Sequence, residues 1–356
     1  MIGLPIRTVL AAALFACCAF AQAKNVVVFV GDAGGVTFLN AASIYGYGKP
    51  QALYIQSMPN VGLADTSTAK EWVTDGAAAG SAMATGIKGA DRVLSINPDG
   101  GAAYKTVLEY AEEKGLSTGL ITNDKDGIAY AALAAYYAHI NDRGRYLDIY
   151  HQFLKPRFGD GPDVVLVTSN KNLNAEVPGG IEAIGAELKA KGYTFARALS
   201  EVSSLDPGKT RVVGMFDDDD FDMALAVKQA MARLSRNPKG FFLVVHSNSH
   251  LAQTRPSLVR LIDLDKAVRA AGEDNQPNTL IIYTADHGYG LYIKGENAAE
   301  TQKSADHKRI VEAIHLEAQH TAEEVPVVAM GPGSERVKGF MSNTDVFHVI
   351  MSAFGW

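Results

Sequence analysis

Cysteine is almost absent from this chain of 356 residues. The two cysteines, Cys17 and Cys18, lie in an N-terminal segment that we expect to be removed. The mature chain would then contain no cysteine, which excludes disulfide bonds even in an oxidising compartment. Stability must therefore come from a hydrophobic core. A chain of this length with 47% hydrophobic residues can bury one, in one large domain or in a domain plus an insertion.

Hydrophobic runs of membrane-spanning length are also missing. The apolar run from Val9 to Phe20 has about 12 residues, whereas a transmembrane helix needs about 20. A basic residue precedes this run and small residues follow it, which is the order of a secretory signal. We therefore expect residues 1–23 to be a signal peptide, residues 24–356 to form a single domain, and the protein to be secreted or periplasmic. A loose match to a lipoprotein cleavage box leaves lipid anchoring at Cys17 as an alternative.

Excess positive charge is lacking as well. The chain has 33 Lys and Arg against 39 Asp and Glu, which gives a formal net charge of −6. Loss of Arg7 with the signal would make it about −7, and this balance argues against a nucleic-acid partner, which would need a basic face. The glycines of segment 31–35 do not form the G-x-G-x-x-G pattern of a dinucleotide-binding loop. A small ligand is the better expectation.

The rest of the sequence alternates between short apolar runs and helical patterns. Residues 24–30, K-N-V-V-V-F-V, are β-branched and lack polar alternation, which indicates a strand buried on both faces of a parallel sheet. Similar runs recur at residues 118–122, 163–168, 240–245, 279–283 and 325–330. Helical patterns lie between them at residues 77–85, 104–114, 147–154, 181–191, 223–235, 256–270 and 344–351. This alternation predicts an α/β fold with a central, mostly parallel sheet sandwiched between helices.

The polar residues that follow these strands are candidate site residues, because ligands of such sheets bind beyond the carboxyl ends of the strands. The first strand runs into Asp32, and the strand at 279–283 is followed by Asp286 and His287. By itself, an adjacent Asp-His pair is more often a hydrogen-bonded turn. Together, two carboxylates and an imidazole at neighbouring strand ends form a ligand set suited to zinc or a similar divalent ion.

The segment from Glu71 to Gly89, E-W-V-T-D-G-A-A-A-G-S-A-M-A-T-G-I-K-G, is the most informative stretch of the chain. It resembles the nucleophile segment of the alkaline phosphatases, T-D-S-A-A-x-x-T-A-x-x-T-G, in which the serine attacks phosphorus from the N-terminus of a helix. This chain has Gly76 at the position of that serine, directly after Asp75. The resemblance implies a frame for phosphoryl transfer that lacks its nucleophile.

Four further segments resemble the same family, in the same order along the chain. They read N-V-V-V-F-V-G-D at 25–32, H-I-N-D-R at 139–143, T-A-D-H at 284–287 and H-T-A-E-E-V-P-V at 320–327. The metal ligands that the resemblance implies are Asp32, Asp286, His287 and His320. Arg143 corresponds to the arginine that grips phosphate through two parallel hydrogen bonds. Asp75, Gly76 and Arg143 are therefore the expected binding residues for a small anionic ligand, a phosphate or sulfate ester.

The chain departs from the family pattern where the remaining metal ligands are expected. The family has F-F-L-x-V-E-G, with a magnesium-binding glutamate, and then an Asp-x-x-x-His zinc pair; residues 241–254 read F-F-L-V-V-H-S-N-S-H-L-A-Q-T. His246 replaces the glutamate, and His250 or Leu251 replaces the aspartate. Because magnesium prefers oxygen ligands, we expect its site to be lost.

These replacements leave two interpretations open. His246 and His250 would share one face if the segment were helical, and with His320 they would rebuild a second, histidine-rich metal site. The alternative is that they are ordinary hydrogen-bonded loop histidines. We therefore expect one zinc site from Asp32, Asp286 and His287, with or without a second one.

Three functions remain compatible with the sequence. The first is a divergent metal-dependent hydrolase of phosphoric or sulfuric esters, in which a metal-bound hydroxide takes the place of the missing serine. The second is a secreted pseudophosphatase that binds an anionic ligand or a partner without turnover. The third is a lyase or isomerase on the same scaffold, with His246 or His250 as the base.

Overall fold

The computed structural model describes residues 22–97, 99, 101–274, 278–295 and 306–356. The predicted signal peptide, with Cys17 and Cys18, lies almost entirely outside these residues. Within the described ranges, no helix is long and apolar enough to cross a membrane.

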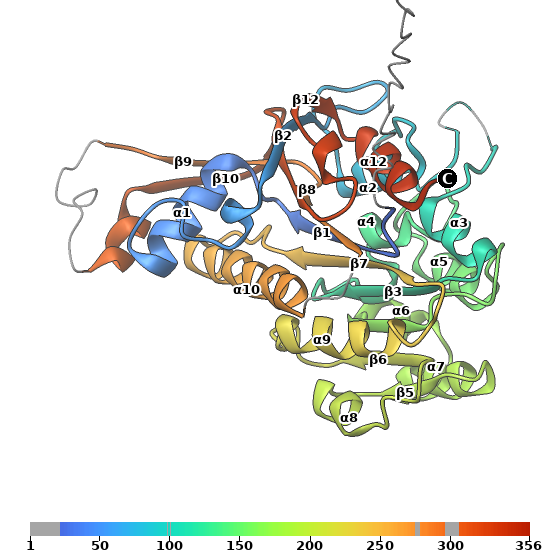
Figure 1. The fold of residues 1–356 in the computed structure, drawn as a ribbon. Coiled ribbons are helices and arrows are strands. Elements are labelled where there is room, and N and C mark those ends of the chain that lie inside the picture. The colour runs from blue at the N-terminus through green and yellow to red at the C-terminus, as the bar shows by residue number, and fades with distance from the viewer. Residues whose placement is uncertain (1–21, 98, 100, 275–277, 296–305) are drawn as a thin grey trace, which may run out of the picture.

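A sheet of ten strands forms the centre of the molecule (Figure 1). Its strand order is β12-β2-β11-β8-β1-β7-β3-β4-β6-β5. The strands are β1 (Asn25–Asp32), β2 (Asn60–Asp65), β3 (Ser117–Thr122), β4 (Val164–Thr168), β5 (Thr194–Ala196), β6 (Val212–Phe216), β7 (Phe241–Asn248), β8 (Thr279–Ala285), β11 (Val325–Met330) and β12 (Gly339–Ser342). Within this ten-stranded sheet, as far as the structure describes it, β11 alone runs antiparallel to its neighbours. The predicted α/β fold with a mostly parallel sheet is confirmed.

Strand β1 shows why the sheet needs helices on both faces. Its eight residues are all buried, and successive side chains point to opposite faces. Val28 and Val30 belong to one hydrophobic cluster, whereas Val27 and Phe29 belong to the other. Because complete burial of a side chain of this size contributes about 1.5–3 kcal/mol, a strand of this composition is stable only inside the sandwich.

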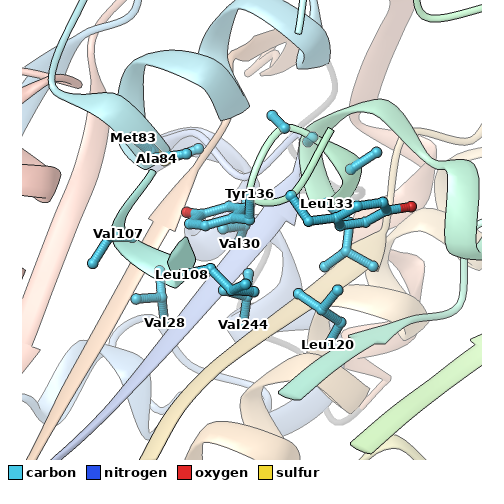
Figure 2. Packing of buried hydrophobic residues seen from close by; sticks show 14 of the residues in the cluster. Val28, Val30, Met83, Ala84, Val107, Leu108, Leu120, Leu133, Tyr136 and Val244 are labelled. Carbon is cyan, nitrogen blue, oxygen red and sulfur yellow. The ribbon is translucent and has the colours of Figure 1, made fainter. Parts of the chain in front are cut away.

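Figure 2 shows the first of these clusters from close by. Val28 and Val30 of β1, Val244 of β7 and Leu120 of β3 lie beneath side chains of the covering helices, among them Met83 and Leu108. The helices of this layer are α2 (Gly76–Thr85), α3 (Val107–Lys114), α4 (Ala131–Ala134), α5 (Tyr146–Leu154), α6 (Lys171–Glu176), α7 (Gly180–Ala190) and α12 (Asp345–Phe354). The opposite layer consists of α1 (Val36–Tyr47), α8 (Leu199–Ser204), α9 (Met223–Leu234) and α10 (Thr254–Glu273).

The sequence pattern located the long elements and missed several others. All six predicted strands and all seven predicted helices are present, with ends that differ by up to three residues. Helix α3 begins at Val107 because Thr106 caps it, accepting a hydrogen bond from the backbone of Glu109. Helix α1 was overlooked because it is apolar on most sides and so lacks the polar stripe of a surface helix.

A hairpin outside the main sheet was also missed. It consists of β9 (Gly288–Ile293) and β10 (Ile314–Thr321), which pair antiparallel. The register shifts between Leu316 and His320, and Ala318 within this bulge has a positive φ of 53°. Such a bulge re-aims the side chains that follow it. Here it precedes His320, one of the predicted site residues.

We expect the buried carboxyl of Glu112, at the end of α3, to make stability fall between weakly acidic and neutral pH. Burial raises the pKa of Glu112 to about 7 from 4.5, although Thr118 donates a hydrogen bond to it at 2.5 Å. The folded state therefore favours the protonated form, and its stability drops by up to about 3 kcal/mol as pH rises from 4.5 to 7. Glu112→Gln should flatten the pH dependence of the unfolding free energy in urea. The exposed neighbour Glu113 provides the control, because Glu113→Gln should leave that slope unchanged; equal slopes in all three proteins would contradict the assignment.

Candidate metal and anion site

Three neighbouring strands bring the predicted ligands to one edge of the sheet. Strand β1 lies between β7 and β8 in parallel register, which sets Asp32 level with Asn248 and Gly31 level with Ala285. The residues that follow these strand ends therefore emerge together. They include His250 after β7, and Asp286 and His287 after β8.

Asp32, Asp286 and His287 form a compact set of buried donor atoms. One ligand atom from each lies within 4.8 Å of the others, and all three residues are buried. The Oδ1 atom of Asp32 and the Oδ2 atom of Asp286 are buried without any hydrogen-bond partner. Because a buried carboxylate oxygen is costly to leave unpaired, these two atoms fit a bound cation.

The hydrogen bond of His287 fixes which nitrogen can ligate. Its Nδ1 atom lies 3.0 Å from the carbonyl oxygen of Gly288, which only accepts, so Nδ1 carries the proton. The Nε2 lone pair then faces carboxylate oxygens of Asp32 at 3.3 Å and Asp286 at 3.7 Å. Burial lowers the pKa of His287 to about 4, which keeps the ring neutral. A lone pair facing two carboxylates is the arrangement that a divalent ion between them would stabilise.

The two carboxyl groups differ in their protonation. Burial favours the neutral form of Asp32, but its interactions with the imidazoles of His287, His246 and His250 and the hydrogen bond from Tyr130 outweigh it, and the pKa of Asp32 lies below its ordinary value. Burial, reinforced by the negative charge of Asp32, raises the pKa of Asp286 well above its ordinary value. In the absence of a cation, Asp286 therefore holds a proton beside an ionised Asp32.

A second group of candidate ligands is made of histidines. His250, His287 and His320 place one nitrogen each within 4.8 Å of one another. The Nδ1 atom of His320 lies 2.8 Å from the carbonyl oxygen of Thr74, which leaves its Nε2 atom free to ligate. Both groups include His287, whose single available nitrogen can serve only one ion at a time. When His287 serves the first group, His250 and His320 are the two histidines of the second group that remain.

The opposite side of the pocket offers donors for an anion. Asp75 caps α2, accepting a hydrogen bond from the backbone of Ala78 at 2.9 Å, so Gly76 is the first residue of this helix. Arg143 donates from Nη1 to Oδ2 of Asp75 at 2.9 Å, which holds its guanidinium at the helix N-terminus. The helix dipole and the guanidinium both favour a negatively charged group there.

Apart from Asp75 and Asp286, the candidate ligands of both groups and the anion donors line one pocket of about 340 Å³. Its walls consist of Asp32, Gly76, Asp124, Lys125, Asp126, Tyr130, Arg143, Asn248, His250, His287 and His320. A sequence profile of the family described as alkaline phosphatase matches residues 23–160 and 175–316. The chain belongs to the alkaline phosphatase family. It is thus a member of a family of hydrolases whose relatives use metal ions.

Curated relatives of this family match nearly the whole chain. The sequence is 26% identical to alkaline phosphatase 4 of Bacillus subtilis, over 93% of this chain and 88% of that protein. It is 27% identical to streptomycin-6-phosphate phosphatase of Streptomyces griseus, over 94% of this chain and 91% of that protein. Among solved structures, alkaline phosphatase from the Antarctic bacterium TAB5 aligns with a TM-score of 0.77 and 24% identity, covering 95% of this chain and 99% of that one. This likeness confirms the predicted fold.

Within this alkaline phosphatase fold, His246 lies apart from the histidine group. Strand β7 continues through Asn248, so the helical arrangement that would align His246 with His250 is not formed. By the alternation of the strand, His246 faces the same layer as Val244, and its ring packs against that of Tyr130 at a tilt of 32°, with centroids 4.2 Å apart. Its Nδ1 atom contacts Thr122 Oγ1 at 2.8 Å. His246 does not line the pocket, whereas His250 does.

Tyr130 is a site residue that the sequence interpretation missed. Its hydroxyl donates to Oδ2 of Asp32 at 2.7 Å, and burial raises its pKa well above the ordinary value, so it remains protonated. A Cβ added to Gly76 would lie 3.1 Å from this hydroxyl and 3.2 Å from Oδ2 of Asp286. Both distances are tighter than most Cβ contacts. The phenol thus occupies the space next to the missing serine, and no sequence motif around position 130 indicated this.

Other hydroxyl groups near Gly76 point elsewhere. Ser81 Oγ donates to the carbonyl oxygen of Ala77 at 2.8 Å, inside α2, and Thr74 Oγ1 donates to the carbonyl oxygen of Asp75 at 3.1 Å. Among the described residues that line the pocket, none is serine or threonine. Neither of these two hydroxyl groups is therefore directed into the pocket beside Gly76.

Metal analysis tests the first group of ligands. Asp286→Asn keeps the shape of the side chain but removes one ligand charge, so we expect the purified protein to lose about one equivalent of tightly bound divalent ion. Mass-spectrometric metal content after dialysis measures this. The matched control is Asp265→Asn, another buried aspartate outside the pocket, which accepts a hydrogen bond from the backbone of Ile55. Equal metal content in the Asp286→Asn and Asp265→Asn proteins would show that Asp286 is not a ligand.

Proposed function

We propose that this chain is a metal-dependent hydrolase of phosphoric or sulfuric esters in which water, not a side chain, attacks the ester. One observation carries the proposal: the pocket unites a buried cation-binding group with an anion-binding helix end, but Gly76 stands where the nucleophile would be. A family member with both binding sides and no hydroxyl at position 76 is suited to a single displacement.

Asp32, Asp286 and His287 would hold a divalent ion in this reaction, with His250 and His320 able to contribute to a second. Zinc fits the nitrogen and oxygen donors of this set. When bound, such an ion lowers the pKa of water to about 7 and polarises the ester oxygens. The unpartnered oxygens of Asp32 and Asp286 support this assignment.

Arg143 and the N-terminus of α2 would orient the anionic group. The pairing with Asp75 restricts the guanidinium before a ligand arrives, which reduces the entropy lost on binding. Gly76 contributes its backbone N–H and leaves room for the anion to approach the helix end. These residues bind and position the ester but do not form a covalent intermediate with it.

A second function, anion binding without turnover, is favoured by Tyr130. Its hydroxyl already pairs with Asp32 and closes the space beside Gly76. A protein that no longer hydrolyses esters would tolerate a tyrosine in this position.

We also propose a secreted or periplasmic location and a single domain at residues 24–356, on the sequence patterns described above.

Restoring the serine is expected to have little effect. Gly76→Ser should change kcat/KM for an aryl phosphate by less than about tenfold, because the added side chain meets Tyr130 and Asp286 and because catalytic groups that act as a unit are not additive. The matched control is Gly76→Ala, which adds the same Cβ without a hydroxyl. If kcat/KM of Gly76→Ser exceeds that of Gly76→Ala by about a hundredfold or more, the introduced serine acts as a nucleophile and the expectation is wrong.

Arg143→Ala tests the anion side. Loss of a charge-assisted pair costs about 1.5–3 kcal/mol, so we expect kcat/KM, or anion affinity if turnover is absent, to fall by about 10- to 150-fold. Arg145→Ala is the matched control, since Arg145 pairs with Asp148 on α5 and does not line this pocket. Equal effects of the two substitutions would exclude Arg143 from anion binding.

A further inference from the structure

The pocket has a third side that belongs neither to the metal ligands nor to the anion donors. It is formed by the loop after β3, with Asp124, Lys125 and Asp126, and by Asn248 at the end of β7. Asp124 is the buried member of this side, with 3% of its surface exposed. It is outside both groups of potential metal ligands.

Hydrogen bonds from neutral groups hold the Asp124 carboxyl in place. Its Oδ2 atom accepts from Nδ2 of Asn248 at 2.6 Å, and its Oδ1 atom accepts from the backbone of Asp126 at 2.7 Å. Asn248 is fixed in turn, because its Oδ1 atom accepts from the backbone of His250 at 3.0 Å. The Asn248 side chain thus links the Asp124 carboxyl to His250, one of the candidate metal ligands.

No cation neutralises this carboxyl. Within the described residues, Asp124 forms no ion pair, and the charged groups that act on it are Asp32, Asp126 and Lys125. Burial raises the pKa of Asp124 to about 7, and the negative charges of Asp32 and Asp126 add to this effect. A buried carboxyl with a raised pKa on the wall of the pocket is suited to proton transfer near neutral pH.

We propose that Asp124 is the proton donor to the leaving-group oxygen. This role rests on the proposed hydrolase function. In the balanced step, the oxygen of water forms a bond to phosphorus, the ester P–O bond breaks, and the leaving oxygen takes the proton of Asp124. The proton released by the attacking water passes to solvent, and solvent then reprotonates Asp124. Asn248 is a positioning residue, because it holds the carboxyl and does not itself donate a proton to the ester.

A pair of substrates with different leaving groups tests this role. Benzyl phosphate releases a poor leaving group that needs a proton, whereas dinitrophenyl phosphate releases one that leaves without it. In the metal-loaded full chain, Asp124→Asn should lower kcat/KM for benzyl phosphate by about 10²- to 10⁴-fold. For dinitrophenyl phosphate the loss should remain below about tenfold, because the proton is not needed there.

The neighbouring carboxylate provides a charge-matched control. Asp126→Asn removes the same charge two residues away, where the side chain accepts a hydrogen bond from Tyr146, and should alter the ratio between the two substrates far less than Asp124→Asn does. If Asp124→Asn slows both substrates equally, or neither, Asp124 is not the proton donor while the hydrolase function stands. If the unaltered protein hydrolyses neither ester, both proposals are wrong.

A measurement on the unaltered protein keeps the test independent of how well the variant folds. With a proton donor in place, kcat/KM should depend only weakly on leaving-group basicity across a series of aryl and alkyl phosphates. A steep dependence would overturn the role of Asp124. Metal content and thermal unfolding of Asp124→Asn, compared with those of the unaltered protein, show whether a loss of rate reflects lost structure.

Discussion

Two neighbouring carboxyl groups, Asp32 and Asp286, are buried at the edge of the sheet without a basic side chain that neutralises both. Burying charge in this way is costly unless a proton or a metal ion compensates it. Without metal, a raised pKa keeps Asp286 protonated, so that the pair carries the single negative charge of Asp32. A divalent ion would displace that proton, and His287, already held in the tautomer with a free Nε2, would complete its ligands. The proposed function depends on this exchange of the Asp286 proton for a divalent ion.

The sheet makes the exchange feasible because it holds these groups rigidly. Strand β1 lies at its centre, paired with β7 and β8 in parallel register, and its side chains pack into both hydrophobic layers. A one-residue slip would turn Asp32 to the other face of the sheet. The site residues at the ends of these strands are therefore held in place by the core. His320 comes from outside the sheet, from the hairpin of β9 and β10 with its bulge at Ala318.

Aromatic rings surround the glycine at position 76. Tyr130 places a protonated phenol between Asp32 and Gly76, and the ring of His246 packs behind it, so two rings fill the side of Asp32 that faces away from His287. The anion donors remain, because Arg143 is held by Asp75 independently of residue 76. The geometry of the site therefore suits both an anion and a cation, and in the proposed function the attacking group comes from solvent.

The sequence alone determined the α/β alternation and the mostly parallel sheet, because buried parallel strands are continuous apolar runs and the residues at their ends are adjacent in sequence to those runs. Asp32, Asp286 and His287 were recognisable for that reason. The family was indicated separately, by the resemblance of five segments in the same order. Tertiary structure decided where His246 and His250 lie. Because β7 continues through Asn248, His246 faces the helices and His250 lies at the pocket. Tertiary structure also decided the places of Tyr130 and Asp124, which reach the site only through packing between segments about a hundred residues apart or more, where no local pattern indicates which way a side chain points.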